Sequence, residues 1–142
     1  MPLLSPADQE RLRASFGEMT SPVRLLFFTQ TLDCDTCVQT REILDELPPL
    51  SDRITIEEVN FVLEKDKAAQ YGIDRVPAIA LASADSDSRI RFLGAPAGYE
   101  FISLVQAVLL VGGRASSLTA ENLARVAAVD KAMMIKVFTT PT

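Results

Sequence analysis

The most constraining feature of this 142-residue sequence is a strand-length apolar run that leads directly to its two cysteines. Residues 23–29 are rich in aromatic and branched side chains, which is typical of a strand buried on both faces. Asp33 or Cys34 can open the helix that follows. That helix is indicated by an apolar stripe, Val38, Ile43, Leu44 and Leu47. A Cys-x-x-Cys motif, Cys34 to Cys37, therefore stands at a strand-to-helix junction.

The composition excludes many catalytic chemistries. The chain contains no histidine, which removes histidine acid/base catalysis, Ser-His-Asp and Cys-His nucleophile systems, and histidine metal ligands. With two cysteines and no histidine, one chain cannot supply the four Cys or His ligands of a structural zinc site. Redox chemistry of the cysteine pair is among the few chemistries that remain.

Charge and hydropathy limit the partners and the location. The net charge is −5, from 14 Lys and Arg against 19 Asp and Glu with no basic patch, so nucleic acid is not expected as a partner. Residues 1–9 lack the cationic stretch and apolar core of a secretory signal. The longest apolar stretch, residues 101–111, is far shorter than the about 20 residues of a membrane span. We therefore expect a cytoplasmic protein without a membrane partner.

The other segments predict alternating helices and strands. Ser5 is the expected N-cap of a first helix with Pro6 at its first position, and Gly72 is expected just past the end of a later helix. In chain order, the expected elements are a helix over 5–18, strands over 23–29 and 53–61, a helix over 63–71, strands over 78–82 and 89–93, and helices over 99–111 and 119–131. A strand, a helix and a strand in succession favour a parallel pair, and the later hairpin is antiparallel. The pattern predicts an α/β fold with a central mixed sheet of about four strands, flanked by helices, and an extra N-terminal helix.

The C-terminal residues repeat the pattern of the first strand. Residues 134–142 (MIKVFTTPT) echo residues 23–31 (VRLLFFTQT), the strand that leads to the cysteines. A repeat at this distance indicates duplicated domains. We expect a folded unit over residues 1–111, a linker and connecting helix over 112–132, and over 133–142 the first strand of a second unit, so that the chain is a fragment of a longer protein. The alternative is a plain C-terminal edge strand.

The position of the cysteine pair favours redox reactivity. At a helix N-terminus, unpaired N–H groups and the positive end of the helix dipole favour the thiolate of Cys34, and Cys37 one turn later can resolve a mixed disulfide. Asp33 and Asp35 oppose the thiolate, and the nearest cation on the helix is Arg41. We therefore expect a modestly lowered Cys34 pKa and a reducing couple. The alternatives are a structural disulfide and half of a zinc site shared by two chains.

Several motifs together resemble one family. They are residues 4–8, 34–37, 71–78 and 92–101, and the tail 136–142. With these motifs the chain resembles the N-terminal unit of the glutaredoxin-like protein disulfide oxidoreductases, which contain two thioredoxin-like units. The resemblance implies a thioredoxin-like fold, one Cys pair in each unit, and reduction, oxidation or isomerisation of protein disulfides. It implies no cofactor beyond the redox-active disulfide, and as partners protein disulfide substrates together with a thiol reductant or reductase.

The resemblance also assigns roles to residues. Cys34 would be the nucleophile and Cys37 the resolving thiol. Val76 and Pro77 would form the cis-proline loop that binds substrate through the backbone of Val76, although Pro77 alone could be an ordinary turn proline. Gly94 would allow close approach of substrate at the rim of the site.

Two departures from thioredoxin affect these expectations. Phe28 occupies the position, six residues before the first cysteine, at which thioredoxin has a buried aspartate. Glu57 or Glu58 on the next strand is a candidate replacement as proton acceptor, although either could be a solvated charge. The acidic Asp35 between the cysteines also differs from thioredoxin's Gly-Pro, so the redox potential of thioredoxin cannot be assumed for this pair.

Two alternative functions remain open. One is an electron-relay domain for a peroxiredoxin-type reductase; in the similar module of peroxide reductases the first unit lacks its Cys pair, which counts against this reading. The other is a redox-inert docking domain, with which a missing buried acid is compatible. If the chain is truncated, the helices over 101–111 and 119–131 and the strand around 135–137 expose apolar surface, and a homodimer is expected.

Overall fold

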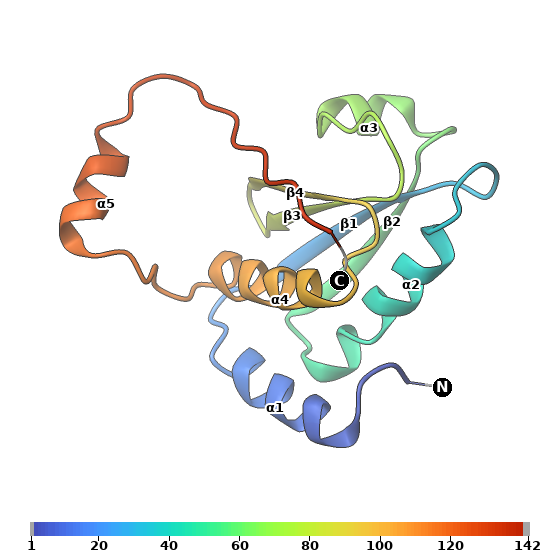
Figure 1. The fold of residues 1–142 in the computed structure, drawn as a ribbon, viewed down its shortest axis with the longest axis horizontal. Coiled ribbons are helices and arrows are strands. Elements are labelled where there is room, and N and C mark those ends of the chain that lie inside the picture. The colour runs from blue at the N-terminus through green and yellow to red at the C-terminus, as the bar shows by residue number, and fades with distance from the viewer. Residues whose placement is uncertain (1, 141–142) are drawn as a thin grey trace.

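The computed structural model describes residues 2–140 of the chain. Figure 1 shows a four-stranded sheet with helices packed on both faces. In chain order the elements are α1 (Pro6–Phe16), β1 (Val23–Thr29), α2 (Cys37–Asp45), the 3-10 turn η1 (Pro48–Leu50), β2 (Ile54–Asn60), α3 (Lys65–Gln70), β3 (Ala78–Ser83), β4 (Asp87–Leu93), α4 (Tyr99–Val111) and α5 (Ala120–Ala127).

The sheet is mixed, as the sequence predicts. Its strand order is β2-β1-β3-β4. Strand β1 is parallel to β2 and antiparallel to β3, which is itself antiparallel to β4. The predicted α/β class with about four strands and an extra N-terminal helix is therefore confirmed.

Strand β1 contributes to a core on each face of the sheet. Val23, Leu25 and Phe27 pack into the larger core with residues of α1 and α4, such as Phe16 and Leu104. Leu26 and Phe28 pack on the other face, in a core that includes Ala68 of α3. Because alternate residues of a strand point to opposite faces, the continuous apolar run is explained by burial on both sides.

Local capping explains where several helices begin and end. The Ser5 side chain accepts a hydrogen bond from the backbone N–H of Asp8 at 3.1 Å, and Pro6 occupies the first helical position. Gly72 follows the end of α3 in the left-handed conformation (φ 67°), and the N–H of Ile73 donates to Ala68 O. These predicted caps of α1 and α3 are confirmed.

The start of α2 differs from the prediction. The helix begins at Cys37 with Thr36 as N-cap, so neither Asp33 nor Cys34 opens it. Asp33 has a left-handed backbone (φ 55°), which turns the chain before the helix can start. Val38, assigned to the buried stripe, is 67% exposed because it lies on the outward face of the first helical turn, while Ile43, Leu44 and Leu47 are buried as expected.

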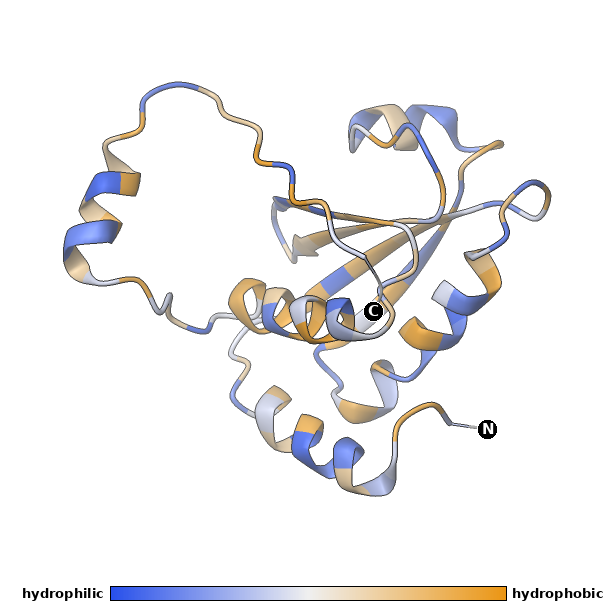
Figure 2. Ribbon diagram, in the orientation of Figure 1, coloured by the Kyte–Doolittle hydropathy of each residue, from blue (hydrophilic) through white to orange (hydrophobic). Residues whose placement is uncertain are grey.

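The segment after α4 lies apart from the core. Residues 113–140 are all exposed, and Figure 1 shows α5 on an arm away from the sheet. Residues 133–140 belong to no strand, because they pair with none of the four strands of the sheet; residues 141 and 142 lie outside the described part. That 133–142 begins a second unit therefore stays a prediction. Figure 2 shows hydrophobic residues along this arm.

The expected exposure of α4 is wrong for most of that helix. Leu104, Val105 and Val108 are buried against the sheet, although Ile102 and Leu110 are exposed. The helix is short of the length needed to cross a bilayer, and no other helix among residues 2–140 is long and apolar enough to do so.

Candidate active site

The predicted site residues come together at one end of the sheet. The cysteine loop follows the C-terminal end of β1, Pro77 directly precedes β3, and Gly94 directly follows β4. Phe28 pairs with Ala78, and Ala78 pairs with Leu93, in two antiparallel ladders. The end of β1, the start of β3 and the end of β4 are therefore neighbours, which places the three loops side by side.

Cys34 and Cys37 form a disulfide whose two members differ in exposure. Their Cα atoms are 5.5 Å apart. Cys34 is partly exposed in the loop, whereas Cys37 is only 4% exposed in the first turn of α2. A partner that approaches from solvent therefore reaches the sulfur of Cys34 first.

Hydrogen bonds from flanking side chains hold the loop. The Gln30 side-chain amide donates to Leu32 O at 2.7 Å and to Asp33 O at 3.4 Å. On the far side of the disulfide, the buried Thr40 hydroxyl donates to Thr36 O at 2.7 Å. Both ends of the loop are thus fixed by contacts that the Cys-x-x-Cys motif alone does not indicate.

The Val76–Pro77 segment presents free backbone groups at this end of the sheet. The Val76–Pro77 peptide bond is cis, as predicted from the sequence. Pro77 is buried, and its carbonyl accepts a hydrogen bond from the N–H of Gly94 at 2.9 Å. Neither the N–H nor the C=O of Val76 is hydrogen-bonded to another residue within 2–140. An extended segment can therefore pair with Val76 as an added strand.

Gly94 combines a special backbone with open space. Its φ of 91° lies in the region that favours glycine, and a Cβ placed there would meet no atom within 4 Å. The position beside Pro77 is therefore accessible, which is compatible with the close approach expected for substrate.

Glu57 and Glu58 on β2 are both held by cations. Glu57 is paired with Lys67 and, at 3.3 Å, with Arg24. Both Glu58 oxygens accept from Arg41, at 2.5 and 2.6 Å, and this hydrogen-bonded guanidinium lowers the Glu58 pKa. Their proposed role as proton acceptor stays a prediction, and these ion pairs weaken it because a paired carboxylate is a poorer base.

An aromatic residue, Phe28, occupies the position of thioredoxin's buried acid. Phe28 is fully buried, and its ring lies 6.0 Å from the ring of Tyr71 in a tilted arrangement. No carboxylate replaces it on β1, since the remaining buried residues of that strand are apolar apart from Thr29.

Glu100 is a candidate acid that sequence reasoning missed. It lies in the first turn of α4, which follows the Gly94 loop, and burial raises the pKa of its carboxyl. Within the described residues its side chain makes no ion pair or hydrogen bond. A glutamate in a first helical turn is common, so the sequence carries no sign of this burial.

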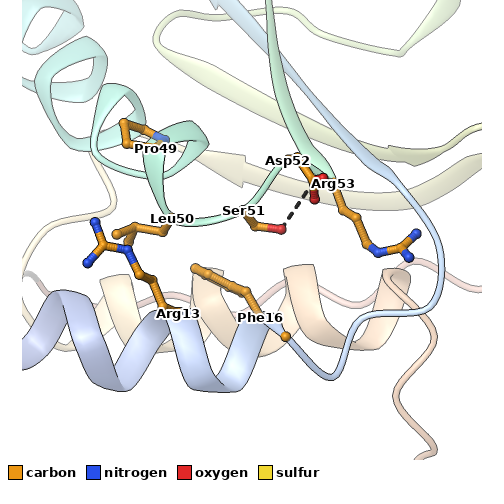
Figure 3. A pocket seen from close by; sticks show the side chains of 8 residues that line it. Arg13, Phe16, Pro49, Leu50, Ser51, Asp52 and Arg53 are labelled. Carbon is orange, nitrogen blue, oxygen red and sulfur yellow. Dashed lines mark hydrogen bonds between the residues drawn. The ribbon is translucent and has the colours of Figure 1, made fainter.

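A pocket lies at the opposite end of the sheet, between α1 and the start of β2. Figure 3 shows Phe16 and Leu50 in its wall, with the guanidinium groups of Arg13 and Arg53 pointing away from each other. These groups do not converge on one point. Among the described residues, no cluster of three or more His, Cys, Asp or Glu could hold a metal ion.

Comparisons with known proteins place this chain in a family. No protein-family model matches the chain. The alkyl hydroperoxide reductase protein AhpF of Escherichia coli is 31% identical over 129 residues, which cover 90% of this chain and 22% of that protein. A probable thioredoxin of Methanothermobacter thermautotrophicus is 32% identical over 73 residues, 51% of this chain and 80% of that protein. The chain thus spans about a fifth of the length of AhpF, and the second match takes in most of the thioredoxin.

Solved structures support the same assignment. The NTD_N/C domain of AhpF from Enterococcus faecalis superposes with a TM-score of 0.82 at 30% identity, covering 90% of this chain and 62% of that chain. A protein disulfide oxidoreductase from Aeropyrum pernix shares the fold, with a TM-score of 0.75 at 22% identity over 87% of this chain and 54% of that one. The chain therefore belongs to the thioredoxin family, as a unit of the kind found in the N-terminal domain of the alkyl hydroperoxide reductase AhpF.

Proposed function

We propose that the chain is a dithiol–disulfide oxidoreductase that acts on protein disulfides, with Cys34 as nucleophile and Cys37 as resolving thiol. The observation that carries the proposal is the unequal exposure of the two sulfurs beside a free backbone segment. Cys34 is partly exposed, Cys37 is buried, and the peptide groups of Val76 have no partner within residues 2–140. This arrangement supports the binding of an extended substrate next to the sulfur that reacts first.

The reaction balances without a cofactor. In the reduced protein the Cys34 thiolate attacks a substrate disulfide; the Cys34–substrate bond forms, and one substrate sulfur leaves as a thiolate that takes up a proton. The Cys37 thiol, on losing its proton, then attacks the Cys34 sulfur and releases the second substrate sulfur as a thiolate, which also takes up a proton. Two electrons and two protons pass from the dithiol to the substrate, and the Cys34–Cys37 disulfide remains, the oxidised state in the structure.

The surroundings of Cys34 support a couple that is reducing rather than strongly oxidising. A strong oxidant needs a stabilised thiolate, and Asp33 and Asp35 beside Cys34 oppose one. Helix α2 begins only at Cys37, so Cys34 lies before its first turn. Because the helix dipole acts mainly within the first turn, it stabilises a Cys34 thiolate less than it would if the helix began at Cys34. A profile of iodoacetamide alkylation rate against pH measures the pKa; a Cys34 pKa below 5 would overturn the expectation.

The direct test is reduction of insulin followed by turbidity in the presence of dithiothreitol. We expect a rate above the dithiothreitol background for the wild type, and background rates for Cys34→Ser and for the double variant Cys34→Ser/Cys37→Ser. A wild-type rate equal to background, in this chain and in the full-length protein, would refute the proposal.

A relay function is the second candidate, because similarity to the alkyl hydroperoxide reductase AhpF extends over 90% of the chain. In that role the pair would pass electrons from a reductase domain to a peroxiredoxin. The relay is supported if the reduced chain is inactive on insulin but is oxidised by a peroxiredoxin disulfide. If Cys34 alkylates no faster than free cysteine, neither redox function holds and a docking role remains.

The same comparison supports the two-unit reading of the C-terminal segment. The chain covers 62% of the AhpF domain it resembles, so that domain is longer than this chain. We propose that residues 133–142 begin a second thioredoxin-like unit that covers the exposed apolar side of α5, which includes Leu123 and Val126. A Cys-x-x-Cys motif soon after Thr142 in the natural gene would support this reading, and a stop codon at that point would refute it.

A further inference from the structure

The end of the sheet that carries the disulfide also has exposed apolar side chains from several separate segments. Leu32 lies in the cysteine loop and Val38 in the first turn of α2, with 76% and 67% of their surface exposed. Leu63 follows β2, Leu93 ends β4 and Tyr99 begins α4, and all three are exposed. These five residues, here named the apolar rim, belong to the same end of the sheet as Cys34.

Two uncompensated negative charges stand within this rim. Asp33 and Asp35 flank Cys34 and are exposed, and within residues 2–140 their carboxylates form neither ion pairs nor hydrogen bonds. Most other charges at this end are paired, and those that remain unpaired within the described residues, Glu100 among them, are mainly acidic. Arg41 is paired with Glu58 and Arg75 with Asp74, while the cation at the start of α3, Lys65, stands between Glu64 and Asp66 in the sequence.

We propose that the preferred partner is a protein or peptide disulfide with a basic residue beside its reactive cysteine and apolar residues around it. The inference rests on the proposed function. The disulfide and the free backbone of Val76 define the site, while Asp33 and Asp35 select the charge of the partner and the apolar rim contacts its apolar residues. A partner of opposite charge meets the site faster, whereas a partner of like charge is repelled. Salt weakens both effects.

The test compares three peptides that each contain one intramolecular disulfide and differ only in the residue next to the attacked cysteine: lysine, glutamine or glutamate. Reduction by the dithiol form of the chain is followed at low salt and at 0.5 M NaCl. We expect the lysine peptide to react about tenfold faster than the glutamate peptide at low salt, and this ratio to fall toward one at high salt.

Matched variants assign the effect to the two aspartates. In Asp33→Asn/Asp35→Asn the ratio between lysine and glutamate peptides should fall to within about twofold. Asp52→Asn removes one exposed charge at the opposite end of the sheet and should keep the ratio. Because the ratio compares two substrates of one protein, it is independent of any change that the variants cause in the Cys34 pKa.

Val38→Thr tests the apolar rim with little change in side-chain volume. This variant should raise KM several-fold more for a peptide with apolar flanks than for a peptide with serine flanks, because only the first loses an apolar contact. Equal rates on the lysine, glutamine and glutamate peptides in the wild type would refute the inference and leave the proposed function standing. Failure to reduce even the glutamine peptide or insulin would refute the proposed function itself.

Discussion

At the residue scale, the two cysteines share one bond but differ in their surroundings. Cys34 stands in a loop fixed by Gln30, whereas Cys37 is buried in the helix. Beneath this end of the sheet, Phe28 fills the site of a buried acid, and the nearby glutamates Glu57 and Glu58 are neutralised by cations. Proton transfer during exchange therefore has to use solvent or another carboxyl, such as the partly buried Glu100, whose pKa is raised by desolvation.

Replacing Phe28 by aspartate tests whether a buried acid would be tolerated here. The substitution removes a fully buried ring from the core around α3 and buries a carboxyl, so we expect a loss of at least about 3 kcal/mol in the free energy of unfolding. Phe28→Leu is the control, with a loss of about 1.5 kcal/mol or less. Urea unfolding of both oxidised variants measures the difference. An aspartate variant as stable as the leucine variant would contradict this account.

Glu100 predicts a specific pH dependence of stability. Burial raises the pKa of Glu100 in the folded state above its value in the unfolded state. The contribution of Glu100 to the free energy of unfolding is therefore most favourable below about pH 4 and is lost as the pH rises through the folded-state pKa. Glu100→Gln should therefore raise the melting temperature relative to wild type at pH 7, and the difference should shrink at pH 3.5.

Glu121→Gln is the matched control for this measurement. Glu121 is the second residue of α5, as Glu100 is of α4, but it is exposed. It therefore carries the same helix-dipole effect without burial. If the two glutamine variants show the same pH dependence, burial of Glu100 is not the cause.

At the element scale, helices α4 and α5 differ in what their apolar residues contact. Helix α4 buries Leu104 and Val108 against the sheet, whereas α5 buries none of its residues. An isolated helix of eight residues is marginal in water, so α5 needs a partner surface to be fully formed. This requirement agrees with the proposal that a second unit covers it.

A pair of leucine substitutions measures this difference directly. Leu104→Ala should lower the free energy of unfolding of this chain by about 2–5 kcal/mol, because it leaves a cavity in the larger core. Leu123→Ala in α5 should change it by less than about 0.5 kcal/mol. Thermal and urea unfolding followed by circular dichroism provide both values. A large loss for Leu123→Ala would show that α5 packs on this unit.

At the scale of the whole molecule, features set by local sequence were predictable and those set by tertiary contacts were not. The caps at Ser5 and Gly72 and the doubly buried β1 depend on neighbouring residues, and they are found as predicted. The late start of α2 depends on the left-handed backbone of Asp33, which a propensity argument does not indicate. Pairing of Glu57 with Lys67 and burial of Glu100 arise only when distant segments pack together.

The candidate site also combines features set by local sequence with features set by tertiary contacts. The motifs at Cys34 and Pro77 could be predicted because their spacing and their positions beside strands follow from the local sequence. That β1, β3 and β4 bring them to one end of the sheet is a property of the topology. The exposure of the apolar rim around the disulfide is likewise a property of the folded unit, and the misassigned Val38 belongs to it.

Trapping of a mixed disulfide tests the central claim most directly. Reduced Cys37→Ser is mixed with insulin, and covalent adducts are identified by intact mass and peptide mapping, with Cys34→Ser as the matched control. Because Cys34 is the exposed sulfur, the account predicts an adduct through Cys34 in the first variant and almost none through the buried Cys37 in the second. Equal adduct yields in the two variants, or no adduct in either, would contradict it.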